Sequence, residues 1–539
     1  MVANAAVIRA AVAFMAFNLT LHGAWLAAVV YAFDRGGAKE AGIVAVATLI
    51  PGALLSPFVT VWFDRYPPNL ALAGGFVFQG AALIGMSVAI ASGIPRFSVY
   101  ALMGLWVIVM GSSRPTMSAV LPRIVIDPTE LAAANAIIGT IETLGLALGP
   151  AAAGLIFYTV DSEYVAFVGF GVAMLAAAAV AVTIRMDPRM QEVDDIGIDI
   201  ESTSVSATVV AGLRLLGSMA GPRHLVILMA AAQSIVGVLE VGVVVIAIDH
   251  MGRSDATAGV LAAAIGIGAI GGSALTFGFV GRRRLSPWIA VGALCATAPI
   301  ALVAATTDTV VIVALMVVAG LGRPLVAVAG RTLLQGLSTD DVLARVFGVF
   351  EGLAFFAVAL GSAAFALIAE VATTEAALVI TAAVPCAIAI ALLGRIRRID
   401  DARPAIDAEL LATMRTIPIF TPLAAFRVEQ MLVNMQKWTF GPNAPVFNKG
   451  DQGDELFVVT SGWAHIDLDG DAVGTRRGGF FGEIALLRDQ PRMASVRAGS
   501  EGMTAYTLDR ETFMSAIATA PLSSARSERV VAQRLGEAG

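Results

Sequence analysis

Charged residues are scarce in this chain of 539 residues. Asp, Glu, Lys and Arg together make up 14% of it, whereas a soluble globular protein carries about 25%. Hydrophobic residues reach 58%, and the mean hydropathy is +0.82. This composition excludes an ordinary soluble protein and predicts an integral membrane protein.

An excess of basic charge and a set of paired cysteines are also missing. The formal net charge is −6, which argues against nucleic acid as a partner. Cys295 and Cys386 lie inside apolar runs, so we expect inert hydrophobic side chains rather than a disulfide or a metal site. The sequence has no kinase, cyclase or phosphodiesterase motif, and we expect no enzymatic activity and no catalytic cofactor.

Apolar runs long enough to cross a bilayer fill most of the chain before residue 395. A hydrocarbon core of roughly 30 Å requires about 20 apolar residues in a helix. Short alternating segments with glycine turns follow after 395, so we predict twelve spans and then a domain outside the membrane. The predicted spans are 7–33, 41–63, 69–93, 97–121, 131–157, 164–184, 223–248, 256–280, 286–306, 309–331, 343–369 and 376–394.

Basic residues are concentrated in every second predicted loop. One set of loops contains the cluster Arg282–Arg284 and most of the remaining arginines, whereas the opposite set places acids such as Asp34 and Asp255 beside its few basic residues. Lys and Arg are enriched in cytoplasmic loops. We therefore expect a multi-pass protein surrounded by plasma-membrane lipids, with both termini and the C-terminal domain in the cytoplasm.

Two motifs recur at one offset. A Gly-x-x-Arg-Pro motif contains Arg114 and recurs at Arg323, and a Gly-x-x-Glu motif contains Glu142 and recurs at Glu351. Both offsets are 209 (323 − 114 and 351 − 142), and the arginine precedes the glutamate by 28 positions in each copy. Two motifs in one register indicate an internal duplication.

Twelve spans arranged as two six-span repeats resemble the major facilitator superfamily, and the first 60 or so residues and the fifth span look most like its bacterial multidrug and siderophore exporters. The resemblance covers about 1–395. It implies an N-terminal half at 1–184, a cytoplasmic middle loop at 185–222 and a C-terminal half at 223–395.

The same resemblance suggests two gating motifs. Gly145-x-x-x-Gly149-Pro150 is similar to the family's antiporter signature. Small residues at a spacing of four let helices approach closely and a proline kinks a helix, so packing alone is the alternative interpretation. Asp64-Arg65 match the acid–arginine pair of the family's cytoplasmic gate, although the glycine and the basic residues that normally flank this pair are missing.

Ionisable side chains inside spans cost roughly 2.5–3.5 kcal/mol each when unpaired and therefore point to function. We expect Arg114 to pair with Glu142. The same pairing in the second half would join Arg323 to Glu351. These pairs serve either transport or the structural locking of adjacent helices. The candidates for transport or coupling are His22, Arg114, Glu142, Glu240, Arg323 and Glu351.

Glu240 has no evident partner in the sequence and is our candidate proton carrier, while His22 is either a proton relay or a hydrogen-bonded neighbour of Asn18. The cavity should be mostly apolar, and a lipophilic small molecule fits it better than a sugar or an amino acid. The aromatic residues expected from the first two spans are Phe14, Phe17, Trp25 and Phe58.

One run after the spans predicts an anion site. Gly482-Glu483 stands ten positions before Arg492 (492 − 482), and small residues follow. Glycine lets the backbone approach a bound anion closely, and arginine offers a planar fork to phosphate oxygens. The glutamate is an acceptor suited to a ribose hydroxyl.

This run resembles the phosphate-binding cassette of cyclic nucleotide-binding domains. The resemblance covers 415–539, after a linker at 396–414, and implies an α+β jelly roll whose last helix, with Leu522, Val530, Val531 and Leu535, closes over the base. It implies that Glu483 accepts from the ribose 2′-hydroxyl and that Arg492 pairs with the cyclic phosphate. The residues implied to bind the nucleotide are Gly482, Glu483, Ile484, Ala485, Arg492, Met493 and Ala494.

Met493 departs from the family, which usually has Ser, Thr, Ala or Gln after the arginine. The missing hydroxyl favours cAMP over cGMP as the regulatory ligand. A domain that folds without binding a nucleotide is the alternative.

Together these patterns predict a mostly α protein, with a twelve-helix bundle of two six-helix repeats followed by a cyclic nucleotide-binding jelly roll. The expected function is cAMP-regulated secondary active transport, with proton-coupled export of a lipophilic small molecule. The alternatives are a membrane-anchored cAMP receptor without transport activity, and a transporter that exports the nucleotide itself.

Overall fold

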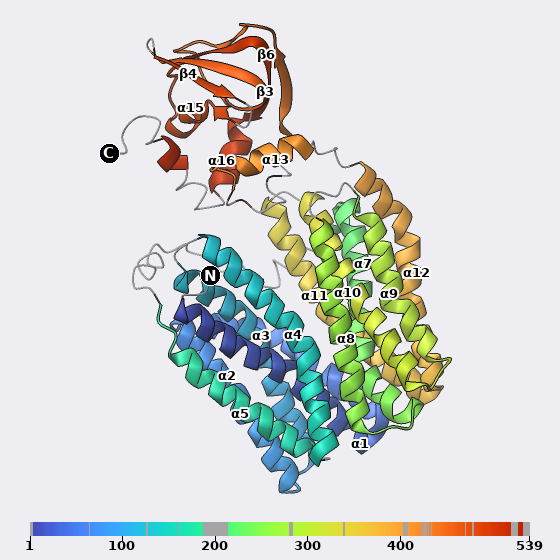
Figure 1. The fold of residues 1–539 in the computed structure, drawn as a ribbon. Coiled ribbons are helices and arrows are strands. Elements are labelled where there is room, and N and C mark those ends of the chain that lie inside the picture. Colours follow the sequence, from blue (N-terminus) through green and yellow to red (C-terminus); the bar gives the residue numbers. More distant parts are fainter. Residues whose placement is uncertain are drawn as a thin grey trace. The chain divides into compact units, whose positions relative to one another are not determined.

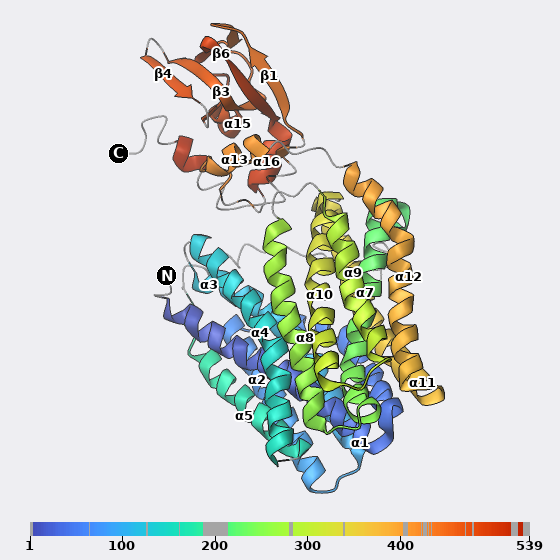
Figure 2. The same cartoon turned by 45° about the vertical axis from the view of Figure 1, so that its right-hand side comes forward.

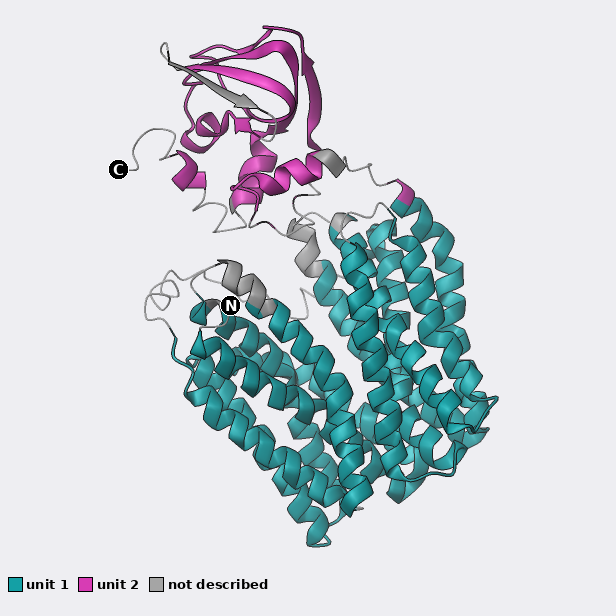
Figure 3. Cartoon of the chain, in the orientation of Figure 1, with its two compact units in different colours: residues 1–279, 284–400 teal, residues 280–283, 401–539 magenta. Residues whose placement is uncertain are grey.

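The computed structural model divides into two compact units (Figure 3). The first comprises residues 1–279 and 284–400, and the second comprises residues 280–283 and 401–539. The residues that the structure describes are 4–63, 65–125, 128–160, 162–186, 214–279, 284–337, 340–402, 408–421, 423, 428, 431–432, 434–468, 471–476, 479–518 and 527–531.

Within the described residues, the first unit has eleven helices long and apolar enough to cross a bilayer. Their positions agree with the predicted spans, and the chain is a multi-pass membrane protein. The helices are α1 (Ala5–Phe63), α2 (Pro68–Ala91), α3 (Arg96–Ile124), α4 (Pro128–Val160), α5 (Glu163–Val182), α7 (Ala220–Val245), α8 (Asp255–Thr276), α9 (Ser286–Val303), α10 (Thr309–Leu337), α11 (Asp340–Val371) and α12 (Thr374–Asp401), with a π-helical turn η2 (Ile246–His250) after α7 and a short η3 (Phe277–Phe279) after α8.

Helix α1 contains two spans. Its 59 residues would extend about 88 Å at 1.5 Å per residue, far more than the roughly 30 Å of a hydrocarbon core. Gly36 and Gly37 interrupt it with non-helical backbone, and the φ of Gly37 is +64°, a conformation that glycine adopts without a steric cost. The break separates the spans predicted at 7–33 and 41–63, so the expected twelve-span bundle is confirmed.

The helices pack as two halves within this unit (Figures 1 and 2). In the N-terminal half, α2 packs against α5, and α1 packs against α3 and α4. In the C-terminal half, α10 packs against α8 and α9, and α7 packs against α11. Two further pairs, α4 with α8 and α1 with α11, join the halves.

Glycines allow the halves to meet at backbone distance. A Cβ on Gly259 of α8 would lie 2.5 Å from the Cα of Gly154 on α4, and a Cβ on Gly154 would lie 3.0 Å from the Cα of Gly259. Any side chain at these positions would therefore push the two helices apart.

The buried apolar residues of the first unit form one large cluster that includes both halves, a second cluster confined to residues 216–396, and a small third cluster of Phe63, Ala71 and Val109. Large apolar side chains also face outward, among them Phe277, Val310 and Leu367. An apolar outer surface is what helices surrounded by lipid require.

Helix α12 continues to Asp401, beyond the span predicted at 376–394. Asp400 is 1% exposed, and its Oδ2 accepts hydrogen bonds from the backbone N–H groups of Leu285 at 2.8 Å and Ser286 at 2.7 Å. Because the first N–H groups of a helix have no partner within the helix, this carboxylate fastens the end of α12 to the start of α9.

The second unit is an antiparallel roll with a helical layer. Its sheet has the strand order β1-β6-β3-β4, with β2 paired to β6 and β5 paired to β3. The elements are α13 (Ala408–Thr416), β1 (Gln436–Phe440), β2 (Pro445–Phe447), β3 (Glu455–Leu468), β4 (Asp471–Arg476), β5 (Phe480–Phe481), α15 (Glu483–Arg488), β6 (Ser495–Asp509) and α16 (Arg510–Ala518).

Strand β3 separates two apolar cores in this unit. Its side chains alternate in direction. Leu456 and Val458 join a cluster with residues of α13 and α16, whereas Phe457 and Val459 join a cluster inside the roll. The helical layer and the roll are thus packed on opposite faces of one strand.

Candidate functional site

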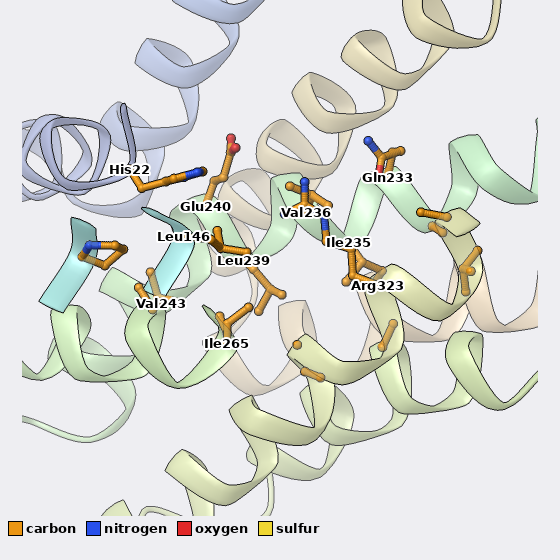
Figure 4. Close-up of a pocket in the computed structure, with 18 of the residues that line it drawn as sticks. His22, Leu146, Gln233, Ile235, Val236, Leu239, Glu240, Val243, Ile265 and Arg323 are labelled. Carbon is orange, nitrogen blue, oxygen red and sulfur yellow. The ribbon is translucent and has the colours of Figure 1, made fainter. Parts of the chain in front are cut away.

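A cavity of about 170 Å³ lies between the two halves of the first unit (Figure 4). This volume has room for on the order of ten water molecules. Helices α1, α4, α7, α8, α9, α10 and α11 contribute to its wall, which is mostly apolar. Its main polar lining residues are His22, Trp25, Gln233, Glu240, Arg323 and Arg331.

Glu240 enters this cavity from α7. Its Oε2 atom is buried and has no hydrogen-bond partner among the described residues. The charge of Arg323, on α10, acts on Glu240, but no ion pair joins the two within the part of the chain that the structure describes. The sequence could not show that these two residues line one cavity, because they lie on different helices 83 positions apart (323 − 240).

The two predicted ion pairs have different outcomes. Arg114 pairs with Glu142, with 3.5 Å between Nε and Oε1, as predicted. The predicted pairing of Arg323 with Glu351 is wrong, because Glu351 accepts from Arg331 at 3.1 Å.

Arg331 explains this difference between the halves. It follows Arg323 by eight residues, about two turns of the same helix, and reaches Glu351 first. The equivalent position in the first half is Pro122 (331 − 209), which offers no competing charge. An arginine without a counterpart in the other repeat was the signal in the sequence that could have identified it.

The motif at Gly145 and Gly149 packs α4 against α1. A Cβ on Gly145 would lie 2.5 Å from the Cβ of Asn18, and a Cβ on Gly149 would lie 3.0 Å from the Cβ of His22. Pro150, the next residue, lines the cavity. The motif therefore lets α4 and α1 approach closely, as the packing interpretation expects, and its Pro150 also forms part of the cavity wall.

The remaining expectations for the first unit are mixed. Of the aromatic residues expected at the cavity, Trp25 lines it, Phe14 and Phe17 are buried in the apolar cluster, and Phe58 faces outward. Asp64 of the gating pair lies outside the described residues. Arg65 is exposed.

The cassette of the second unit begins at Gly482, between β5 and α15. Its φ of +93° and ψ of −3° are left-handed, a conformation that side chains disfavour. Glu483 follows and is 1% exposed. Ala485 is also buried, whereas Ile484 and Ala494 are partly buried and Met493 is 37% exposed.

Arg492 is held beneath the cassette and is 6% exposed. Its Nη1 donates to the Gly482 carbonyl at 3.0 Å, and its Nη2 donates to the Glu455 carbonyl at 2.8 Å. The guanidinium lies over the Phe447 ring, 4.3 Å from the centroid. Its Nε is buried and has no hydrogen-bond partner among the described residues.

The environment of Arg492 keeps a positive charge in a largely buried place. Burial lowers the pKa of its guanidinium, and the nearby carboxylates of Glu455 and Asp454 act in the opposite direction. An arginine side chain remains protonated at neutral pH. The cassette therefore presents a fixed cation beside a left-handed glycine.

Sequence reasoning missed two supports of this site. Gly453 lies against Arg492, and a Cβ there would collide with its Nε. Arg510 braces the far end of α15, since its Nη1 lies 2.7 Å from the Asp489 carboxylate and its Nη2 donates to the Ala485 carbonyl at 3.1 Å. A glycine and an arginine at these places have no distinctive spacing, so only the fold reveals them.

The predicted lid lies only partly in the described residues. The helical segment 527–531 places Glu528 3.3 Å from Arg488 of α15, and it buries Val531. Val530 packs at the edge of the helical cluster. Leu522 and Leu535 lie outside the described residues.

The two units match different families. Residues 10–350 match the family model described as Major Facilitator Superfamily, and residues 437–520 match the one described as Cyclic nucleotide-binding domain. In its fold the chain is similar to the nucleoside transporter NupG, with a TM-score of 0.58 and 12% sequence identity, over 72% of this chain and 98% of that one. At this identity the likeness concerns the fold alone.

Similar curated proteins include a cAMP-dependent protein kinase regulatory subunit and a cGMP-dependent protein kinase. The cAMP-dependent protein kinase type II regulatory subunit of Drosophila melanogaster is 31% identical over 107 residues, which cover 20% of this chain and 28% of that protein. The cGMP-dependent protein kinase egl-4 of Caenorhabditis elegans is 29% identical over 113 residues, which cover 20% of this chain and 14% of that protein. The chain thus spans less than a third of the length of these relatives.

Proposed function

The chain belongs to the Major Facilitator Superfamily and carries a cyclic nucleotide-binding domain after its last span, and on this premise we propose that it is a secondary active transporter regulated by cAMP. In this proposal the transport unit comprises 1–395, the linker 396–414 and the regulatory domain 415–539. The protein resides in the cell membrane with both termini in the cytoplasm, where the nucleotide is available.

The arrangement around Arg492 carries the regulatory part of the proposal. Two of its nitrogens are held by backbone carbonyls, and its buried Nε has no partner among the described residues. A buried donor on a cation requires an acceptor, and a cyclic phosphate supplies one. Glu483 provides the acceptor for the ribose hydroxyl, and the exposed Met493, which has no hydroxyl, favours cAMP over cGMP.

The cavity supports the transport part. It lies between the two halves, it is mostly apolar, and it contains Glu240 with a buried oxygen that has no hydrogen-bond partner among the described residues. A carboxyl in such a place is suited to binding and releasing one proton per cycle. We therefore assign proton coupling to Glu240 and export of a lipophilic small molecule to the cavity.

Regulation requires cAMP to bind one conformation of the transporter more tightly than another. Spin labels test this without knowledge of the substrate. They would be placed at Ser118 on α3 and Val328 on α10, after replacement of Cys295 and Cys386 by serine. The distance between the labels would be measured in lipid nanodiscs with and without cAMP, beside an Arg492→Ala variant.

We expect cAMP to shift the distance distribution in the parent protein and to leave it unchanged in the Arg492→Ala variant. Calorimetric binding of cAMP with an unchanged distribution would reject the regulation and favour a membrane-anchored receptor. If no cAMP binds to the parent protein, the cassette is inactive as a nucleotide site and the proposal fails at its first step.

A further inference from the structure

The duplication of the first unit predicts one Arg–Glu pair in each half, but the structure forms only the first of them. Arg114 pairs with Glu142. In the second half Glu351 is taken by Arg331. Arg323 is consequently an arginine whose repeat-equivalent partner is occupied, and no ion pair to it occurs within the described residues.

Arg323 lines the cavity between the halves (Figure 4). Its side chain is exposed to this space. The neighbouring wall is apolar and includes Leu239, Val243 and Ile265. A guanidinium beside such a wall favours an anion that contacts it, because apolar side chains offer the charge no hydrogen-bond acceptor.

Two other arginines near the cavity are paired with glutamates. Arg331 and Glu351 neutralise each other, and so do Arg114 and Glu142. Among the described residues, Glu240 is the carboxylate whose charge acts on Arg323, and the charges of Arg114 and Arg331 act on it in the opposite direction. When Glu240 carries a proton, the cavity has a net positive charge at Arg323, and when it is ionised it is the anion that competes for that charge.

From this broken symmetry we infer that the cavity binds an organic monoanion with an apolar or aromatic body. Its acid group pairs with the Arg323 fork, and its body packs against Leu239, Val243 and Ile265. The inference rests on the proposed transport function and specifies the substrate class of that same cavity. It predicts discrimination against cations and neutral molecules of the same shape.

Three naphthalene probes of matched shape test the charge selectivity: 1-naphthoate, 1-naphthamide and 1-naphthylmethylammonium. Binding to the purified full-length protein would be measured by titration calorimetry in detergent. We expect naphthoate to bind at least about tenfold more tightly than the amide, as the loss of one charge-assisted hydrogen bond implies. Equal binding of naphthoate and the amide, or preference for the ammonium, overturns the inference without any variant.

Variants then test the assignment to Arg323. Arg323→Gln should lose the preference for naphthoate, and Arg323→Lys should retain part of it. Arg331→Gln should also lose it, because Glu351 is then released to form the pair that the repeat predicts. The double variant Arg331→Gln, Glu351→Gln should bind naphthoate again. Unchanged affinity in Arg323→Gln or in Arg331→Gln, with the fold verified by thermal unfolding, overturns the inference.

The source of the anion is distinguished in an Arg492→Ala background, in which the cassette is disabled. Competition of cAMP with naphthoate there would identify a nucleotide as the organic anion of the cavity, and absence of competition would exclude cAMP from this site. These results are independent of the spin-label experiment. Binding of naphthoate in a protein that does not respond to cAMP would preserve the anion site and reject only the regulation.

Discussion

Two glycines of the second unit allow the effect of displacing the Arg492 side chain to be separated from the effect of backbone strain. Gly482 has a φ of +93°, and Gly450 has a φ of +92°. A Cβ on Gly482 would lie 2.5 Å from Nη1 of Arg492 and 2.9 Å from the Glu455 carbonyl oxygen, whereas a Cβ on Gly450 would meet nothing within 4 Å. The substitutions Gly482→Ala and Gly450→Ala thus impose similar strain but differ in what they displace.

The expected magnitudes follow from these contacts. Each alanine adopts the left-handed conformation at a cost of roughly 1–2 kcal/mol. Only Gly482→Ala also drives the guanidinium of Arg492 away from its carbonyl partners, and a hydrogen bond to a charged group contributes about 1.5–3 kcal/mol. The affinity for cAMP should therefore fall about 10- to 150-fold in Gly482→Ala and stay within about threefold of the parent in Gly450→Ala.

Titration of cAMP into the full-length proteins by calorimetry measures this difference, and thermal unfolding without nucleotide reports the shared strain. Gly482→Ala should also have the lower unfolding midpoint of the two variants. Equal loss of affinity in both would mean that strain alone governs the site. Full affinity in Gly482→Ala would refute the view that the position of Arg492 determines phosphate binding.

Two further substitutions, each with a control variant, test the packing of the first unit. Gly259→Ala forces α8 away from Gly154 and should lower the thermal unfolding midpoint. Gly271→Ala lies on the same helix with nothing near its Cβ, so it should leave the midpoint unchanged or raise it slightly. Equal midpoints in the two variants would contradict the backbone contact. Asp400→Ala removes the acceptor of two buried N–H groups and should destabilise the protein by about 2–4 kcal/mol. Arg397→Ala, at an exposed position of the same helix, should change stability by about 0.5 kcal/mol or less. Chemical unfolding of both variants measures the difference, and similar values would refute the fastening role of Asp400.

The spans were predictable because a bilayer imposes a length and a polarity on every helix that crosses it, and a run of consecutive residues shows both properties. The repeat was predictable for the same reason, since its two motifs keep one offset. The exchange of partners at Glu351 was not predicted, because pairing depends on which arginine reaches the carboxylate across two helices. Spacing along the chain contains no information on that reach.

In the cassette, too, local features were predictable from the sequence and contacts between distant segments were not. The positions of Gly482 and Arg492 follow from a local pattern, and the structure places them in contact. Glu455, the first residue of β3, and Gly453, just before it, contact the arginine from about forty positions earlier in the chain. The pairing of β3 with its neighbours brings them there. Asp400 likewise acts on a helix 114 residues away from it.

The partition of the second unit by β3 has a mechanical consequence. Because the helical layer and the interior of the roll are separate cores, the helices can slide over the sheet without opening the roll. The cassette starts on this dividing line, since Phe480 belongs to the helical core and Phe481 to the roll. A ligand bound there would contact both cores at their boundary and could shift the helices while the roll stays in place. Amide hydrogens of α13 and α16 would then exchange together, and those inside the roll would exchange at their own, slower rate.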